Sequence, residues 1–168
     1  MNEHFPESAT SVLTQTDNNT TLWIGHFGND PTDHFGGQTF TCPAAGTLDN
    51  IQVLTTAVQC PGELRLSLHE FDGDSLQWGH AIAESTIHVE STDLGKWIRF
   101  PLPSVYLKNN TGYGFRLQSG NAMIGLGEAA SDNQHPFTFG REWHADSDNR
   151  QGHFYNYFSL AFKVEMRA

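Results

Sequence analysis

The stretch "ELRLSLHEF", residues 63–71, decides the fold class because apolar and polar residues alternate without a break from position 63 to position 69. Successive side chains of an extended strand point to opposite faces. Leu64, Leu66 and Leu68 therefore share one face, and the polar residues between them share the other. A period of two predicts a strand with one face in a core and one face toward water.

The same alternation recurs along the chain. It is present in "TGYGFRLQS" (residues 111–119) and is clearest in "YFSLAFKVEM" (residues 157–166). No segment keeps apolar residues at the three- and four-residue spacing of an amphipathic helix over three turns, so no long helix is predicted. We expect the C-terminal segment to be one strand with five apolar side chains on a single face: Phe158, Leu160, Phe162, Val164 and Met166.

Nine or ten short strands with turn-forming residues between them predict an all-β fold. A strand with one apolar face needs a second sheet to cover it, and a chain of 168 residues suits one domain. We therefore predict a single-domain antiparallel β-sandwich over residues 21–168. Residues 1–20 are polar and lack periodicity, which predicts a flexible N-terminal arm.

Charge and hydropathy exclude several classes of partner. The formal net charge is −10, and the nine Lys and Arg residues do not cluster in the sequence, so nucleic acid is not expected as a partner. No run of eighteen apolar residues is present, so no membrane insertion is expected. The N-terminus lacks the features of a signal peptide, and we expect an extracellular or particle-associated protein without a recognisable signal in this chain.

Four segments together resemble a known group of domains: "GGQTFTCPAAGTLDNIQVLT" (36–55), "GELRLSLHEF" (62–71), "KWIRFPLPSVYLKNNTGYGFRLQS" (96–119) and "YFSLAFKVEM" (157–166). Their core and turn residues are similar to those of the jelly-roll accessory modules of bacterial extracellular proteins. The resemblance spans residues 36–166. It implies a jelly-roll β-sandwich and a non-catalytic, carbohydrate-binding-like or adhesive role.

The polar stretch "REWHADSDNRQGHFY", residues 141–155, is the candidate ligand-binding segment. Sugar rings expose C–H faces that stack on aromatic side chains, while polar side chains bind the hydroxyl groups. Trp78, in a predicted turn, is expected to contribute a second aromatic platform. The predicted ligand-binding residues are Trp78, Arg141, Trp143, His144 and Tyr155.

Metal binding is considered for the same stretch. "DSDN" (146–149) begins like a calcium loop, but Arg150 occupies the fifth position and no bidentate acid follows, so it is not an EF-hand. An irregular calcium site at Asp146 and Asp148 stays open beside the alternative of a solvated Asp/Asn turn. No other cofactor is expected.

The sequence gives less support to a transition-metal site or to hydrolase activity than to ligand binding. The chain has nine histidines but no His-x-His pair, and the segment "EWHAD" (142–146) is interpreted as placing its Glu and His on opposite strand faces. The glutamates form no recognisable glycosidase pair, and no nucleophile motif is present. We therefore predict that the protein is not an enzyme. Cys42 and Cys60 are expected to be two small buried thiols, with a disulfide between them as the alternative.

The function predicted from sequence is a non-catalytic binding or adhesion module that recognises a glycan or glycoconjugate. The first alternative is a structural or decoration subunit of a virion or other particle, docked through residues 1–20. A metal-assisted hydrolase is a weaker alternative. The expected partner is a glycan or a protein in a larger assembly, and self-association into a homo-oligomer is also open.

Overall fold

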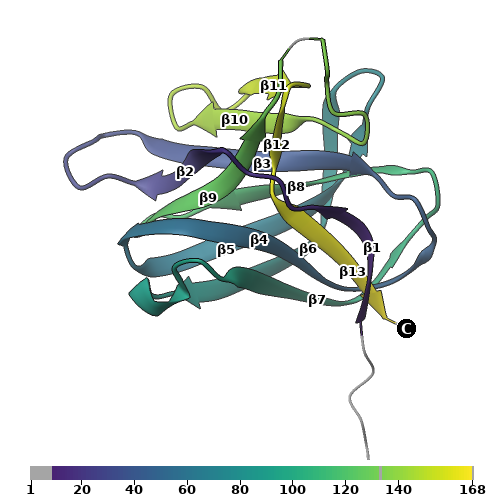
Figure 1. The fold of residues 1–168 in the computed structure, drawn as a ribbon, viewed down its shortest axis with the longest axis horizontal. Helices are drawn as coiled ribbons and strands as arrows, with labels where there is room; N and C mark the ends of the chain where they lie inside the picture. The colour runs from purple at the N-terminus through teal and green to yellow at the C-terminus, as the bar shows by residue number, and fades with distance from the viewer. Residues whose placement is uncertain (1–8, 133, 168) are drawn as a thin grey trace, which may run out of the picture.

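The computed structural model describes residues 9–132 and 134–167 (Figure 1). These residues form thirteen strands and one short 3-10 turn, η1 (Ser91–Asp93), and every strand pairing is antiparallel. The predicted all-β class is confirmed. Within the described ranges, no helix is long and apolar enough to cross a membrane.

The first sheet is built around the long strand β4 (Gly46–Cys60). Its first half pairs with β13 (Phe162–Arg167) and with β7 (Trp97–Leu107), and β1 (Ala9–Gln15) pairs with the outer side of β13. In Figure 1, β1 runs beside β13 toward the C-terminus.

The second sheet is larger. Its strand order is β9-β2-β3-β8-β5-β6, and the second half of β4 pairs with β9. On the edge of β3 opposite to β2 and β8, a further strand, β10, pairs with β3. The bounds are β2 (Thr20–His26), β3 (Asp33–Thr41), β5 (Gly62–Asp72), β6 (Gln77–Val89), β8 (Gly112–Gln118), β9 (Met123–Ala130) and β10 (Glu142–Asp146).

Two segments pass from one sheet to the other. β4 does so along its length, and the C-terminal segment does so at Ala161, which separates β12 (Phe158–Leu160) from β13. β12 pairs with β9 of the second sheet, whereas β13 pairs with β4 of the first. The single C-terminal strand predicted from sequence is therefore two strands, because alternation continues through a crossing that changes the pairing partner.

The core lies between the two sheets. The Phe162 ring of the first sheet is 6.1 Å from the Phe40 ring and 5.9 Å from the Phe115 ring of the second, measured between centroids. Leu64, Leu66 and Leu68 are fully buried, as their alternation predicted. The two layers agree with a β-sandwich, and the jelly-roll connectivity stays a prediction.

The N-terminal arm was predicted too long. Residues 9–15 form β1 rather than a flexible segment, and Leu13 packs against the core cluster. Gln15 is buried, and its amide donates hydrogen bonds to the carbonyls of Asp17 (2.9 Å) and Leu160 (3.3 Å). Residues 1–8 of the predicted arm lie outside the described residues.

The two cysteines differ in exposure, so the prediction of two buried thiols is wrong for one of them. Cys42 is buried and Cys60 is exposed, and both are free thiols. Burial raises the pKa of the Cys42 thiol. Its S–H group donates a hydrogen bond to the Ala44 carbonyl at 3.0 Å.

Replacing Phe162 by Ala should destabilise the fold strongly. Phe162 is fully buried against Phe40, Phe115 and Phe139, and large-to-small changes of this kind cost about 3–5 kcal/mol. Urea unfolding measures the loss. The matched control is Phe27→Ala, since the Phe27 side chain is 46% exposed and should change the unfolding free energy by far less.

Thiol labelling should distinguish the two cysteines. Cys60 is exposed and should react with a maleimide in the native protein, whereas the buried Cys42 should react only after unfolding. Mass spectrometry of the labelled chain gives the count. Two rapidly labelled thiols under native conditions would contradict the described burial of Cys42.

Candidate functional site

The stretch 141–155 forms a β-hairpin rather than a continuous loop. β10 pairs with β11 (His153–Tyr155), so that Trp143 faces Phe154 and His144 faces His153, and only residues 147–152 form the turn. The hairpin lies at the top of Figure 1 and is anchored on β3, where Trp143 pairs with Gly37.

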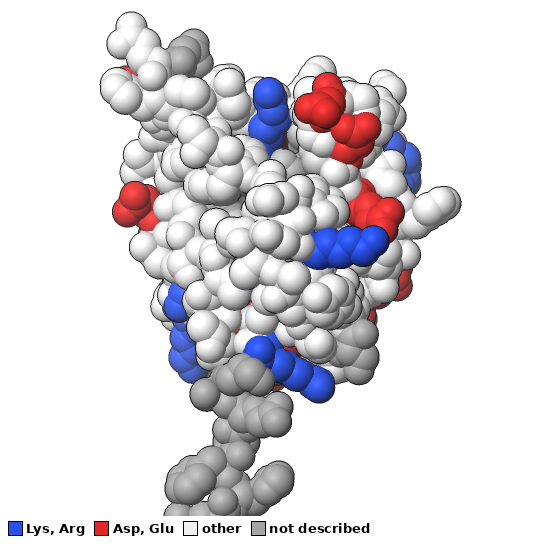
Figure 2. Space-filling view, turned by 90° about the vertical axis from the view of Figure 1, so that its right-hand side faces the viewer, with Lys and Arg blue, Asp and Glu red and all other residues white. Residues whose placement is uncertain are grey.

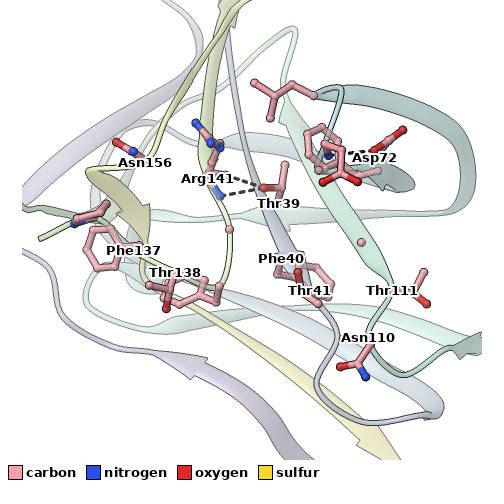
Figure 3. Close-up of a pocket in the computed structure, with 18 residues that line it drawn as sticks. Thr39, Phe40, Thr41, Asp72, Asn110, Thr111, Phe137, Thr138, Arg141 and Asn156 are labelled. Carbon is pink, nitrogen blue, oxygen red and sulfur yellow. Dashed lines mark hydrogen bonds between the residues drawn. The ribbon is translucent and has the colours of Figure 1, made fainter. Parts of the chain in front are cut away.

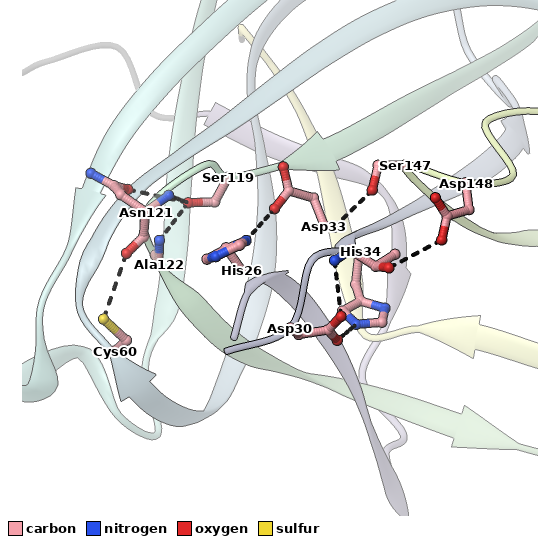
Figure 4. Close-up of polar contacts among 11 residues, drawn as sticks. His26, Asp30, Asp33, His34, Cys60, Ser119, Asn121, Ala122, Ser147 and Asp148 are labelled. Atoms are coloured by element: carbon pink, nitrogen blue, oxygen red, sulfur yellow. Dashed lines mark hydrogen bonds and ion pairs between the residues drawn. The ribbon is translucent and has the colours of Figure 1, made fainter. Parts of the chain in front are cut away.

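The predicted calcium ligands, Asp146 and Asp148, instead accept hydrogen bonds that stabilise the turn of this hairpin. Asp146 Oδ1 accepts hydrogen bonds from the backbone N–H groups of Asp148 (2.9 Å) and Asn149 (2.7 Å). Asp148 Oδ2 accepts a hydrogen bond from the Thr32 hydroxyl at 3.2 Å (Figure 4). The two carboxylates act as turn and loop acceptors, and within the described ranges they belong to no cluster of three metal-ligating side chains. This arrangement corresponds to the solvated Asp/Asn turn, and a calcium ion is not needed to explain it.

Polar contacts also tie the turn to the β2–β3 connection, as Figure 4 shows. The Ser147 hydroxyl accepts a hydrogen bond from the Asp33 backbone N–H at 3.0 Å. The Asp33 carboxylate is 2.6 Å from His26 Nδ1. In the same connection, the Asp30 carboxylate is 3.0 Å from His34 Nε2. The Ser147 contact thus joins the hairpin turn to β3, and the two histidine contacts stabilise the β2–β3 segment that receives it.

The two predicted tryptophans meet, but they do not form an exposed platform. Trp78 lies in β6 rather than in a turn, and its ring is 5.4 Å from that of Trp143 in a T-shaped arrangement. Trp143 is only 2% exposed, so the prediction of an accessible Trp143 is wrong. Gly114 makes room for this pair, because a Cβ at that position would lie 2.6 Å from Trp78 Cζ3.

Arg116 stacks on both indole rings. Its guanidinium carbon is 4.3 Å from the Trp78 centroid and 4.8 Å from the Trp143 centroid, distances at which cation–π attraction is effective. The side chain is half-buried, and this burial lowers the pKa of Arg116. Its buried Nε has no hydrogen-bond partner among the residues that the structure describes.

A groove runs over this face of the second sheet, on the side away from the core. It has a volume of about 280 Å³ and is bordered by Phe35, Arg65, Glu84, Arg116 and Arg150, among others. A neighbouring hollow of about 640 Å³ shares Phe35, Arg65, Gln118 and Arg150 with it, so the two form one continuous surface. We call this surface the arginine groove.

The floor of the arginine groove includes an imidazole. His69 Nε2 is 2.9 Å from the Ser67 hydroxyl, and its Nδ1 is 3.1 Å from the Gly79 carbonyl. Burial lowers the pKa of His69 and so favours its neutral form. The positive charge in the 280 Å³ part of the groove therefore comes from its arginines.

Figure 2 shows a molecular face on which Lys and Arg side chains are dispersed among acidic side chains rather than gathered in one place.

The opposite face of the hairpin carries a second cluster, which the sequence analysis missed. Glu142 and His144 are two residues apart on β10, and Glu128 reaches them from β9. The His144 Nε2–H group donates a hydrogen bond to Glu142 Oε2 and lies 3.4 Å from Glu128 Oε2. The interpretation of "EWHAD" as separating its Glu from its His is wrong, because alternation puts residues i and i+2 on one face.

Burial and mutual contact drive the pKa values of the cluster apart. Desolvation raises the pKa of Glu142 well above its usual range, and the Glu128 charge adds to that rise. Desolvation also acts on Glu128, but hydrogen bonds to His144 and Glu142 outweigh it and lower the Glu128 pKa. Burial opposes protonation of His144, yet its contacts with both carboxylates raise its pKa to about 9.

The remaining predicted residues lie in two places. The Tyr155 ring is 4.7 Å from the His144 ring, so these two residues do meet, but on the hairpin face opposite to the tryptophans. Arg141 borders a separate hollow of about 660 Å³ at one end of the sandwich, where the Thr39 hydroxyl makes two hydrogen bonds to the Arg141 backbone (Figure 3). The five predicted ligand residues therefore divide among three surfaces.

No family model matches the chain, and no curated protein matches it. The arginine groove and the glutamate–histidine cluster therefore have to be interpreted from their own geometry and chemistry.

The stability of the protein should fall as the pH rises from about 6.5 to about 9. The raised pKa of His144 means that the folded state holds a proton that the unfolded state releases near pH 6.5, and this stabilisation is lost as the pH passes about 9. The raised pKa of Glu142 acts in the same direction above the usual glutamate range. The decrease can reach about 1.4 kcal/mol per pH unit for one such proton.

Urea unfolding between pH 6.5 and pH 9 in the presence of EDTA tests this slope. His144→Gln should flatten it, and His153→Gln, which changes an exposed histidine of the same hairpin, should leave it unchanged. An equal slope in wild type and His144→Gln would contradict the assignment.

Proposed function

We propose that the protein is a non-catalytic binding module that holds an acidic glycan in the arginine groove. The observation that carries the proposal is the convergence of three of the nine basic residues of an acidic chain on one groove of 280 Å³. In this 280 Å³ part of the arginine groove, Arg65, Arg116 and Arg150 lie beside one carboxylate, Glu84, whereas the 640 Å³ part adds Asp33 and Glu63.

The groove offers the contacts that an acidic sugar needs. Guanidinium groups bind carboxylate or sulfate oxygens through paired, charge-assisted hydrogen bonds. The Gln118 amide and the exposed Glu84 carboxylate can bind sugar hydroxyls. The Arg150 guanidinium carbon lies over the partly exposed Phe35 ring, 5.6 Å from its centroid, and a sugar C–H face can stack on this ring where the arginine is displaced by the ligand. Phe35 takes the stacking role that the sequence analysis had given to Trp143.

The shape of the groove favours a chain rather than a single sugar. The 640 Å³ hollow continues from the shared residues toward Asp33, Glu63 and Asn121. This half has carboxylates and amides, which suit neutral hydroxyl groups. A polysaccharide could place an acidic unit at the Arg116 end and neighbouring units along the hollow.

The paired carboxylates of the second cluster do not favour glycoside hydrolysis. Glu142 and Glu128 have pKa values displaced in opposite directions, as an acid and a nucleophile would require. However, the Glu142 side chain is fully buried and that of Glu128 is 6% exposed, and both lie on the sheet face opposite to the groove. A sugar has no route to a position between them, which supports a non-catalytic role.

The role as a particle decoration stays a prediction. Residues 9–15 of the proposed docking arm are used in β1, and residues 1–8 lie outside the described residues. The groove does not require an assembly to be complete.

Affinity electrophoresis tests the proposed function. Native gels containing polygalacturonate, alginate or a sulfated galactan should retard the protein, whereas dextran gels should not. Arg150→Ala and Arg65→Ala should each weaken the interaction roughly tenfold or more, because a hydrogen bond to a charged group contributes about 1.5–3 kcal/mol.

Two controls separate the groove from general charge effects. Arg99→Ala makes the same charge change on the first sheet, and Arg141→Ala makes it in the end hollow. Both should retain the retardation of the wild type. Retardation that is unaffected by Arg150→Ala and Arg65→Ala, or that falls equally in all four variants, would exclude the arginine groove as the binding site.

A further inference from the structure

Glu128, Glu142 and His144 form the one group of three metal-ligating side chains found within residues 9–132 and 134–167. One ligand atom from each lies within 4.8 Å of the others. The group combines two carboxylates with one imidazole nitrogen, and it comes from two strands, β9 and β10, that are not hydrogen-bonded neighbours. It is therefore a tertiary arrangement and not a by-product of one strand.

The cluster is deeply buried and incompletely paired. The side chain of Glu142 is fully buried and that of Glu128 is 6% exposed. Glu142 Oε1 and Glu128 Oε2 are both buried, and apart from the contact between the two carboxyl groups they have no hydrogen-bond donor among residues 9–132 and 134–167. Glu128 Oε2 points into the cluster, 3.4 Å from His144 Nε2. Buried carboxylate oxygens are costly when they are unpaired, so a group that binds both would stabilise this arrangement.

The Gln38 amide lies next to the cluster but is held by other contacts. Gln38 pairs with Glu142 across the β3–β10 register, but its amide nitrogen donates to the Thr39 carbonyl at 3.1 Å. Its amide oxygen accepts a hydrogen bond from the Leu160 N–H at 3.0 Å. These two contacts fix the orientation of the Gln38 amide, and within the described residues its second N–H makes no hydrogen bond to either carboxylate.

We propose that Glu128, Glu142 and His144 bind a divalent transition-metal ion of the zinc class, through one carboxylate oxygen of each glutamate and Nε2 of His144. An imidazole nitrogen with only two carboxylates suits zinc or a neighbouring first-row ion, whereas calcium prefers six to eight oxygen ligands. The ion replaces the Nε2–H proton that now contacts Glu142.

The surroundings of His144 provide a route for the ion. His144 is the exposed member of the cluster, with 29% of its side chain accessible, and it borders a pocket of about 250 Å³ between β2 and β10. Trp23, His34 and His153 also line this pocket. Three protein ligands leave a coordination position open for water or another small ligand.

The proposed metal site is independent of glycan binding. Its ligands point away from the arginine groove, whereas Trp143, between Glu142 and His144 in the sequence, points toward it. A metal ion would cross-link β9 to β10 and so fix the strand that carries Trp143. Loss of glycan binding and loss of metal binding can therefore be measured separately.

Equilibrium dialysis of EDTA-treated full-length protein against zinc chloride tests the proposal. The wild type should retain one equivalent of zinc and should show a higher melting temperature with zinc than with EDTA, since an ion that binds only the folded state stabilises it. His144→Gln and Glu142→Gln should each lose the retained equivalent and the zinc-dependent rise. The controls His34→Ala and His153→Ala remove the neighbouring pocket histidines and should keep both.

Imidazole NMR of the wild type provides a test that does not require any variant to fold. Zinc should perturb the His144 ring resonances out of those of nine histidines. The proposal is overturned if the wild type retains no zinc, if folded His144→Gln and Glu142→Gln still retain the equivalent, or if zinc perturbs other histidine rings and leaves that of His144 unchanged.

Discussion

The burial of Phe162 between the two sheets is the contact on which the rest of the architecture depends. The residue follows Ala161, the point at which the C-terminal segment leaves the second sheet and joins the first. Its ring packs on Phe40 and Phe115 of the opposite layer. The same crossing places β12 beside β9, which brings Leu160 next to Glu128, so the packing of the core and the position of the glutamate–histidine cluster have a common cause.

Alternation in the sequence was sufficient to predict the fold class and the inner faces of the principal strands. Leu64, Leu66 and Leu68 are buried as expected, because a period of two is a local property that tertiary contacts preserve. Local patterns could not predict the division of the final strand at Ala161, because alternation does not change when a strand changes its partner. β1 was missed because few of its side chains are apolar, and its pairing with β13 joins positions far apart in the sequence.

The functional surfaces were predicted less completely, and the reasons differ. The convergence of Arg65, Arg116 and Arg150 depends on the pairing of β5 with β8 and on the position of the turn between β10 and β11. No short sequence motif predicts either feature. In contrast, the proximity of Glu142 to His144 could have been inferred, because their spacing of two on a strand places them on one face. Only the arrival of Glu128 from β9 required the structure.

The position of Arg116 has a consequence for the energetics of any ligand in the groove. Stacking on Trp78 and Trp143 has already fixed its side chain during folding, so the loss of rotational freedom belongs to the folding equilibrium. Arg150 is exposed and makes one longer stacking contact, with its guanidinium carbon 5.6 Å from the Phe35 centroid. It therefore keeps more rotational freedom to lose when a ligand arrives, and immobilising a side chain of this kind costs roughly 0.5–1.5 kcal/mol. The two arginines would thus contribute to affinity with different entropies, since Arg116 is immobilised more fully in advance.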